Sequence, residues 1–133
     1  MKLELGKLLD SKEALRVLGN TRGFKSVVAY RVSKNIKGIN KELKAYEEAR
    51  VKLVEEHCKK DDEGKARIKE NGSYDVIEGH MDIINIELEE LRKEEVEIEV
   101  RKVTLDDIEK AELTPFEIEA LEFMIDFEED VAD

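Results

Sequence analysis

The side chains that could bind a metal or act as nucleophiles are few. His57, Cys58 and His80 are the only imidazole and thiol groups in the chain. Adjacent residues on a helix project about 100° apart, so His57 and Cys58 are not expected to converge on one ion. We expect Cys58 to be a small buried apolar residue, and both histidines to pack or meet solvent near helix ends. The sequence thus predicts no metal site and no cofactor.

Patterns typical of catalysis are equally weak. No spacing pairs a serine or cysteine nucleophile with a histidine base, and the chain has no glycine-rich phosphate loop. Residues 59–70 have the length of a calcium loop, but Lys59 stands where the first oxygen ligand is required. Acids are so numerous that a pair of carboxylates is not diagnostic of hydrolysis. We expect the protein not to be an enzyme.

Charge is distributed unevenly along the chain, whose net charge is -11. Residues 1–60 carry 15 basic and 8 acidic side chains, a net of +7, whereas residues 61–133 carry 8 and 26, a net of -18. Because opposite charges attract, we expect the two halves to pair within the fold or across a homo-oligomer, with a dimer as the first expectation.

Two charged sets are candidate binding sites. The predicted partner-binding face lies where acids are densest and consists of Glu87, Glu90, Glu94, Glu97 and Glu99. Its field would attract a basic protein and imitate the phosphates of DNA, or it serves solubility alone. The predicted anion-binding set consists of Arg22, Lys25, Arg31 and Lys34. The basic run continues through Lys37, Lys41 and Lys44. The alternative is that these side chains lie on the outer face of the helix and pair with the acidic half, and the isoelectric point near 4.8 favours that over direct nucleic-acid binding.

The elements that must position these residues follow from periodicity. From Phe24 to Lys60 there is no proline and apolar residues recur every three or four positions, which predicts one long helix that could bend at Gly38. The same spacing from Ile77 to Glu94 predicts a second helix. The two are expected to pack antiparallel along matching apolar stripes: Val32, Ile36, Ile39, Leu43 and Tyr46 on the first, and Ile77, Met81, Ile84, Leu88 and Leu91 on the second.

Alternating apolar and polar residues predict short strands. Leu3 and Leu5 alternate with charged residues, as do the apolar residues from Val96 to Val100, and we expect these two segments to pair. Between the two long helices, Asn71-Gly72 separates the alternating segments 65–70 and 73–77. This arrangement predicts a β-hairpin with a two-residue turn.

Reciprocal capping patterns mark the starts of three shorter helices: Asp10 with Glu13, Thr104 with Asp107, and Thr114 with Glu117. The first helix is expected to stop at Gly19-Asn20 in a left-handed conformation. The second is expected at 105–112, and the third carries a broad apolar face from Phe116 to Phe127. Residues 128–133 are expected to form a disordered acidic tail.

Together these expectations define one α+β domain over residues 1–133, in which a long antiparallel helical hairpin packs with a small antiparallel sheet and a C-terminal helix. Ile83, Ile86 and the apolar face of the last helix exceed what one helix pair covers, which favours a homo-oligomer. No apolar run approaches the roughly 18 residues of a membrane span, and the first residues alternate charge with leucine, unlike a signal peptide. We therefore expect a cytoplasmic protein that does not cross a membrane.

The order of these elements resembles a group of small phage and prophage proteins from Gram-positive hosts. The resemblance rests on the N-terminal strand, the helix pair around Lys60-Asp61-Asp62-Glu63-Gly64, the strand Val96–Val100, and the ending Leu113–Glu117 with Leu121–Ile125. It implies a viral accessory or assembly protein without its own catalysis, and it implies no site residues.

Three functional hypotheses follow. The first is an accessory protein that occupies a basic surface of a host or viral protein with its acidic half, and so inhibits, for example, a defence or nucleic-acid-binding protein. The second is an assembly component of a phage particle that forms a homo-oligomer. The third is sequestration of a small, nucleotide-like anion by the basic residues near Arg22 and Lys25.

Overall fold

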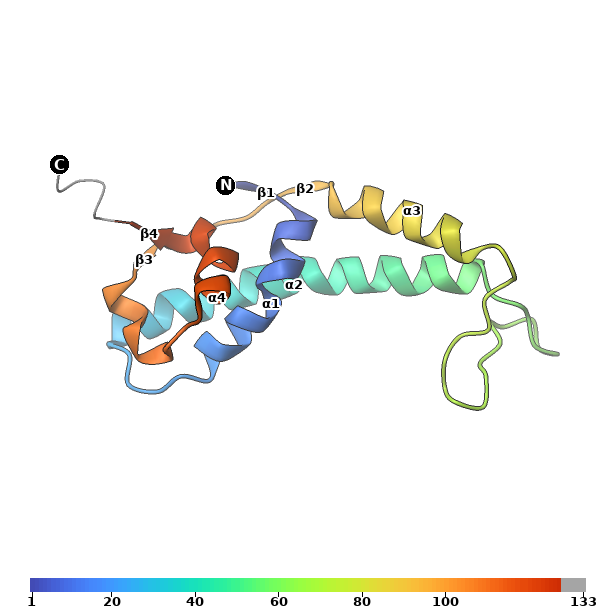
Figure 1. Cartoon of the computed structure of the whole chain (residues 1–133), viewed down its shortest axis with the longest axis horizontal. Coiled ribbons are helices and arrows are strands. Elements are labelled where there is room, and N and C mark those ends of the chain that lie inside the picture. The colour runs from blue at the N-terminus through green and yellow to red at the C-terminus, as the bar shows by residue number, and fades with distance from the viewer. Residues whose placement is uncertain (128–133) are drawn as a thin grey trace.

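The longest element is α2, Ser26–Glu56, which runs along the long axis of the molecule (Figure 1). The structure is a computed structural model that describes residues 1–127. The acidic tail predicted at 128–133 lies outside the described residues. The prediction of one long helix is confirmed, although α2 is shorter at both ends, and the chain stays helical through Gly38.

The first helix, α1, spans Leu5–Gly19 and begins well before its predicted start. Asp10 lies inside this helix, so the interpretation of Asp10 and Glu13 as a capping box was wrong. Leu5 belongs to the helix rather than to the preceding strand, because Leu5 and Leu8 are buried on the helix face that meets the core. Burial against the rest of the chain therefore decides where this helix starts.

The end of α1 was predicted at the correct place but with the wrong conformation. Asn20 has φ of -103°, which is not left-handed. Its side-chain amide Nδ2 instead donates to the carbonyl oxygen of Arg16 at 2.8 Å, and Thr21 Oγ1 donates to the carbonyl oxygen of Val17 at 2.8 Å. The carbonyl groups of the last helical turn therefore receive hydrogen bonds from these two side chains. In a left-handed cap, backbone amides beyond a left-handed glycine would donate to them instead.

Two pairs of short strands accompany the helices. Strand β1, Lys2–Glu4, pairs antiparallel with β2, Glu95–Glu97, as predicted, with Leu3 opposite Val96. The second strand is shorter than expected, because the chain beyond Ile98 leaves the ladder and crosses to α2. A further pair was not predicted: β3, Val103–Thr104, lies parallel to β4, Ile125–Asp126.

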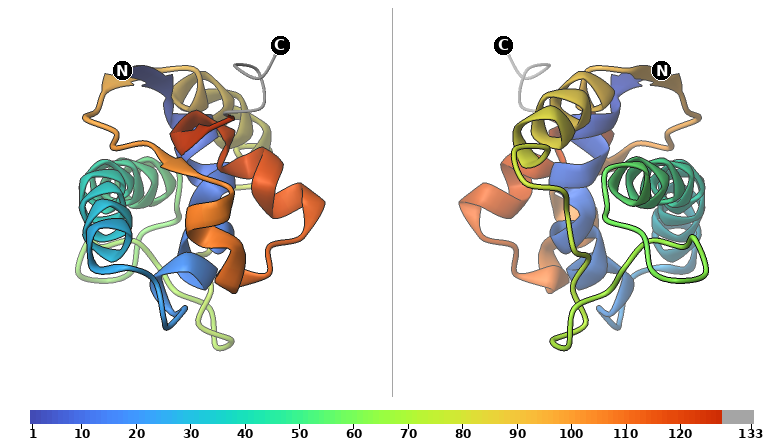
Figure 2. Two further views of the ribbon diagram at one scale, coloured as in Figure 1. Left: turned by 90° about the vertical axis from the view of Figure 1, so that its left-hand side faces the viewer. Right: turned by 90° about the vertical axis from the view of Figure 1, so that its right-hand side faces the viewer.

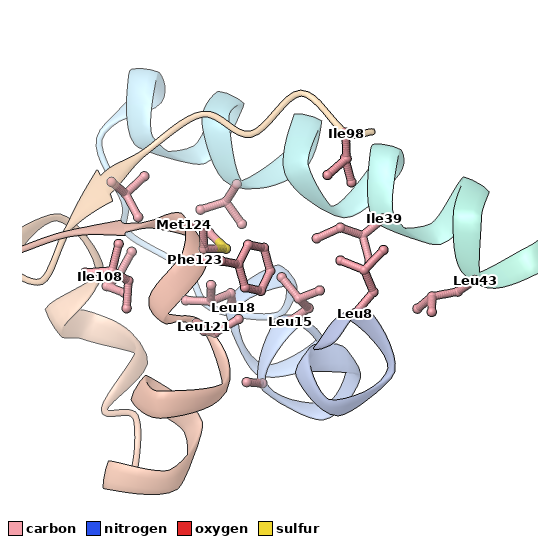
Figure 3. Close-up of a cluster of buried hydrophobic side chains, with 14 of the residues drawn as sticks. Leu8, Leu15, Leu18, Ile39, Leu43, Ile98, Ile108, Leu121, Phe123 and Met124 are labelled. Carbon is pink, nitrogen blue, oxygen red and sulfur yellow. The ribbon is translucent and has the colours of Figure 1, made fainter. Parts of the chain in front are cut away.

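The main core lies between α1, the first half of α2 and the C-terminal segments (Figure 3). Figure 2 shows α1 lying between α2 and α4. The buried stripe of α2 at Val32, Ile39 and Leu43 therefore packs against α1, and the expectation that it would match the second long helix was wrong for this half. The sequence pattern showed that the stripe is buried, but did not identify the element that covers it.

The predicted helical hairpin forms only along the second half of α2. Helix α3, Met81–Arg92, lies beside that half and runs in the opposite direction (Figure 1). A small second cluster of Val54, Cys58 and Ile84 joins the two helices. The start of α3 is later than predicted because Gly79 has φ of +84°, a left-handed conformation that a helix does not contain.

The connection between α2 and α3 folds back on itself as predicted, but through isolated bridges and a different turn. The bridges pair Cys58 with Val76, Lys60 with Ala66, and Ile68 with Tyr74. The amide of Lys69 donates to the carbonyl of Ser73 at 2.8 Å and the amide of Gly72 donates to the carbonyl of Lys69 at 2.9 Å. The loop thus has three residues, with Gly72 left-handed at φ +86° and Asn71 not left-handed, so the predicted two-residue turn was wrong.

Both capping patterns that were predicted for the C-terminal region, at Thr104 with Asp107 and at Thr114 with Glu117, are present. The amide of Thr104 donates to Asp107 Oδ2 at 2.9 Å and the amide of Asp107 donates to Thr104 Oγ1 at 3.1 Å, although the turn that follows, η1 at Asp106–Ala111, is a 3-10 helix. Thr114 and Glu117 form a complete capping box at the start of α4, Pro115–Ala120.

The last helix does not continue to Phe127, so that expectation was wrong. After Ala120 the chain turns through η2, Glu122–Met124, and enters β4. This path buries Leu121, Phe123 and Met124 in the main core, whereas Phe116 is left 84% exposed on α4. The parallel pairing of β4 with β3 requires an extended backbone, which a longer helix would not supply.

One polar side chain is buried inside α2. Asn35 is 1% exposed, and its amide Nδ2 donates to the carbonyl oxygen of Arg101 at 2.8 Å while its Oδ1 accepts from the Arg101 amide at 2.8 Å. The side chain thereby pairs with the backbone as a neighbouring strand would. It holds the segment between β2 and β3 against α2.

Candidate functional site

The outer surface of α3 combines exposed apolar residues with acids. Ile84 is 1% exposed and faces α2, whereas Ile83 is 42% and Ile86 is 61% exposed. A short helix that packs by one narrow stripe leaves most of its circumference in solvent. Ile83 and Ile86 expose apolar surface on that solvent side, which is unfavourable in water.

Three of the predicted acidic residues lie in line with these isoleucines. Positions 83, 87, 90 and 94 are four, three and four residues apart, so they fall on one side of α3 and of the turn that follows it. We call this surface the α3 ridge and define it as Ile83, Ile86, Glu87, Glu90 and Glu94. Among residues 1–127, no ion pair includes Glu90 or Glu94, and Glu87 Oε2 lies 3.9 Å from His57 Nε2.

The other two predicted acids, Glu97 and Glu99, lie beyond the ridge and have cations beside them. Glu97 Oε1 accepts a hydrogen bond from the amino group of Met1 at 2.8 Å, and this bond lowers the pKa of the Glu97 carboxyl. Glu99 Oε1 lies 3.2 Å from Arg101 Nη2. The five predicted residues therefore divide into three on the ridge and two that form ion pairs beyond it.

The predicted anion-binding residues spread over the loop before α2 and its first three turns. Lys25 lines a groove of about 220 Å³ with one further cation, Lys110, and three acids, Asp106, Asp107 and Glu109. Arg22, Arg31 and Lys34 do not line this groove. Arg31 Nη1 donates to the carbonyl oxygen of Lys102 at 3.2 Å. The three carboxylates outnumber the two ammonium groups, so the charge of this groove does not favour an anion.

A regular basic surface lies elsewhere on α2. Residues spaced three and four apart form one exposed line opposite the core, which we call the α2 basic stripe: Val27, Tyr30, Lys34, Lys37, Lys41 and Lys44. The Arg101 guanidinium lies 5.6 Å from the centre of the Tyr30 ring. The four lysines belong to the basic run of the sequence, and their expected position on the outer face of the helix is confirmed.

The structure also brings together the two histidines, which the sequence argument treated separately. Their Nδ1 atoms are 3.0 Å apart, and their ring planes meet at 67°. Cys58 belongs to the second cluster: it is 2% exposed, its Sγ donates to the carbonyl oxygen of Val54 at 3.1 Å, and burial raises the pKa of its thiol. The expectation of a buried, apolar Cys58 is confirmed.

Comparisons with protein-family models, curated proteins and solved structures give no match for this chain. In residues 1–127, no helix combines the length and the apolar character needed to cross a membrane.

Proposed function

We propose that this chain is a non-enzymatic protein-binding module whose α3 ridge docks on a basic surface of another protein. The observation that carries this proposal is the exposure of Ile83 and Ile86 in line with Glu87, Glu90 and Glu94. An apolar centre rimmed by charge is typical of surfaces that bind another protein.

The isoleucines and the glutamates of the ridge contribute to binding in different ways. Burial of Ile83 and Ile86 contributes affinity, because each removes apolar surface from water. Glu90 and Glu94 lack a cation in the described structure, so they supply a negative field that speeds the encounter with a basic partner and orients it. Binding should therefore combine a salt-sensitive association rate with a dissociation rate set by the isoleucines.

The resemblance to phage accessory proteins supports a partner of host or viral origin in the host cytoplasm. A row of carboxylates on a helix presents charge as a nucleic acid does, so nucleic-acid-binding proteins, including defence proteins, are the preferred class of partner. The ridge would inhibit such a protein by covering its basic surface. Direct binding of nucleic acid by this acidic chain is not part of the proposal.

A second candidate function, self-assembly, is favoured by the α2 basic stripe. In the N-to-C direction this stripe presents two apolar residues, Val27 and Tyr30, and then lysines, while the α3 ridge presents two isoleucines and then glutamates. The ridge of one copy could therefore lie parallel to the stripe of a second copy, with apolar and opposite charges matched. Within one copy the two helices are antiparallel, so this match requires two molecules, and a dimer is the simplest product. Capture of a small anion has less support, because three acids and two lysines line the groove at Lys25.

One set of variants tests both candidates. Glu87, Glu90 and Glu94 are replaced together by glutamine, and a control variant carries glutamine at Glu109, Glu112 and Glu119, which removes three charges from exposed residues of the C-terminal region. Each protein is used as bait in a cell lysate, and captured proteins are quantified at roughly 50 and 300 mM salt. Light scattering of each pure protein gives its mass in solution.

We expect the parent and the control variant to capture basic proteins and the ridge variant to capture none. The amount captured is expected to decline as the salt concentration rises. A parent protein that captures no basic protein but has the mass of a dimer, lost in the ridge variant, would favour self-assembly. Equal capture by all three baits would contradict a role for the ridge.

A further inference from the structure

The chain contains only two histidines, and the fold places them against each other. His57 follows the last turn of α2 and His80 precedes the first turn of α3, and their Nδ1 atoms are 3.0 Å apart. We propose that His57 and His80 form a two-histidine site for a late first-row transition-metal ion such as Zn²⁺, bound through the two Nδ1 atoms with water in the remaining positions. This inference does not depend on the proposed function of the ridge.

The separation of the nitrogens is close to what a metal requires. Zinc–nitrogen bonds are about 2.0–2.1 Å long, so two nitrogens on a tetrahedral zinc ion stand roughly 3.3 Å apart. The rings need to separate by a few tenths of an ångström from the observed 3.0 Å. Neither ring is locked in the core, because both histidines are half-buried and lie at helix ends. The rings meet at 67° rather than stacking, so a small rotation of each can aim both lone pairs at one point.

Proton positions also suit a metal. At 3.0 Å one Nδ1 donates its hydrogen and the other accepts it with a lone pair. A metal ion takes the place of that shared hydrogen when the donating ring moves its proton to its own Nε2. Both imidazoles then stay neutral, each coordinates through Nδ1 and carries hydrogen on Nε2, and no net proton is released.

Glu87 lies on the far side of the His57 ring and favours this arrangement. Its Oε2 is 3.9 Å from His57 Nε2, too long for a hydrogen bond but close enough to favour hydrogen on Nε2 and a cation at Nδ1. A carboxylate is one of the usual partners of the non-coordinating nitrogen of a metal-binding histidine. Glu87 is therefore a positioning residue and not a ligand.

The predicted affinity class follows from the ligand count. Among residues 1–127 no group of three or more His, Cys, Asp or Glu side chains could hold a metal ion, and Cys58 faces the second cluster. Water must complete the coordination, so binding is weaker than at a four-ligand structural zinc site and is reversible. Imidazole ligands select zinc, nickel or copper over magnesium and calcium. Bound metal would join the end of α2 to the start of α3, at the base of the ridge.

The test uses the unmodified protein first. Two-dimensional NMR of the imidazole nitrogens, recorded with and without Zn²⁺, is expected to move the Nδ1 resonances of both histidines. Thermal unfolding is then followed with Zn²⁺, Ni²⁺ and Mg²⁺. At a metal concentration about ten times Kd, zinc and nickel are expected to raise Tm by about 4 °C and magnesium to leave it unchanged.

Variants then locate the site. His80→Gln is expected to abolish the zinc-dependent rise in Tm, Glu87→Gln to weaken it, and the control Glu90→Gln to preserve it. Equal stabilisation of His80→Gln, or an equal effect of magnesium, would overturn the proposal and assign the ions to the acidic surface. Imidazole resonances that do not move in excess zinc would overturn it without any variant.

Discussion

The buried amide of Asn35 offers the sharpest test of how the molecule is held together. Replacing Asn35 by alanine removes both 2.8 Å hydrogen bonds to the backbone of Arg101, and leaves that amide and carbonyl without their partners. Two hydrogen bonds contribute about 2 kcal/mol net, and orphaned polar groups at a partly buried position add about 1 kcal/mol or more. The expected loss in the free energy of unfolding is about 3 kcal/mol, or roughly 10 °C in Tm.

Urea unfolding measures this loss, with the denaturant slope expected to stay the same as in the parent. Asn40→Ala is the matched control, because it makes the same substitution on the same helix at an exposed residue, and it should change stability by less than about 0.5 kcal/mol. Amide exchange at Arg101 should accelerate in Asn35→Ala only. If Asn35→Ala and Asn40→Ala unfold at the same urea concentration, the paired amide does not hold this segment against α2.

Three further predictions follow from burial and charge. Leu43→Asp should destabilise the protein by several kcal/mol because Leu43 lies in the main core, and Leu88→Asp should destabilise it by less because Leu88 is half-buried beside the second cluster. Calorimetry that ranks the two variants in the opposite order would contradict the division into two clusters. The Cys58 thiol, whose pKa burial raises, should react with a thiol reagent only as fast as the protein opens, and fast labelling of the native protein would contradict its burial. The pKa of Glu97 is lowered, so its contribution to stability is present near neutral pH and is lost as pH falls through the folded-state pKa. Acetylating the N-terminus should raise this pKa toward its ordinary value in an NMR titration. An unchanged pKa would exclude the amino group as the cause of the lowered value.

The helices that could be predicted from the sequence are those with strong local signals. The period of apolar residues identified α2, and the capping box at Thr114 and Glu117 identified the start of α4. Both signals act within one or two helical turns, so they are independent of tertiary contacts. These helices together with the predicted strand pair, in which Leu3 lies opposite Val96, gave the correct α+β class.

The misplaced boundaries depend on contacts between distant residues. Leu5 alternates with charged neighbours as a strand residue would, but it is helical because α1 buries it against the core. Leu121 and Ile125 fit a helical face, but the chain is extended at Ile125 because β3 lies alongside it. No pattern within a short window of sequence contains this information.

The residues of the candidate site also divide into those with a local sequence signal and those that depend on contacts between distant residues. Acid density drew attention to α3, but it did not distinguish Glu90, which has no ion pair within residues 1–127, from Glu97, to which the N-terminal amino group donates a hydrogen bond. The contact between His57 and His80 depends on how the loop between α2 and α3 folds back, including its three-residue turn, which the sequence analysis predicted incorrectly. A pair that meets across such a loop has no signature in residue spacing.

The central claim is that the α3 ridge contacts a basic partner protein, and photo-crosslinking in cells tests it most directly. A photoreactive phenylalanine analogue is placed at Ile86, on the ridge, or at Ala49, which is exposed on α2 outside both the ridge and the basic stripe. Crosslinking to a basic protein from position 86 but not from position 49, lost when Glu87, Glu90 and Glu94 are replaced by glutamine, is the predicted result. Equal crosslinking from both positions, or crosslinking at 86 that survives the loss of the three glutamates, would contradict it.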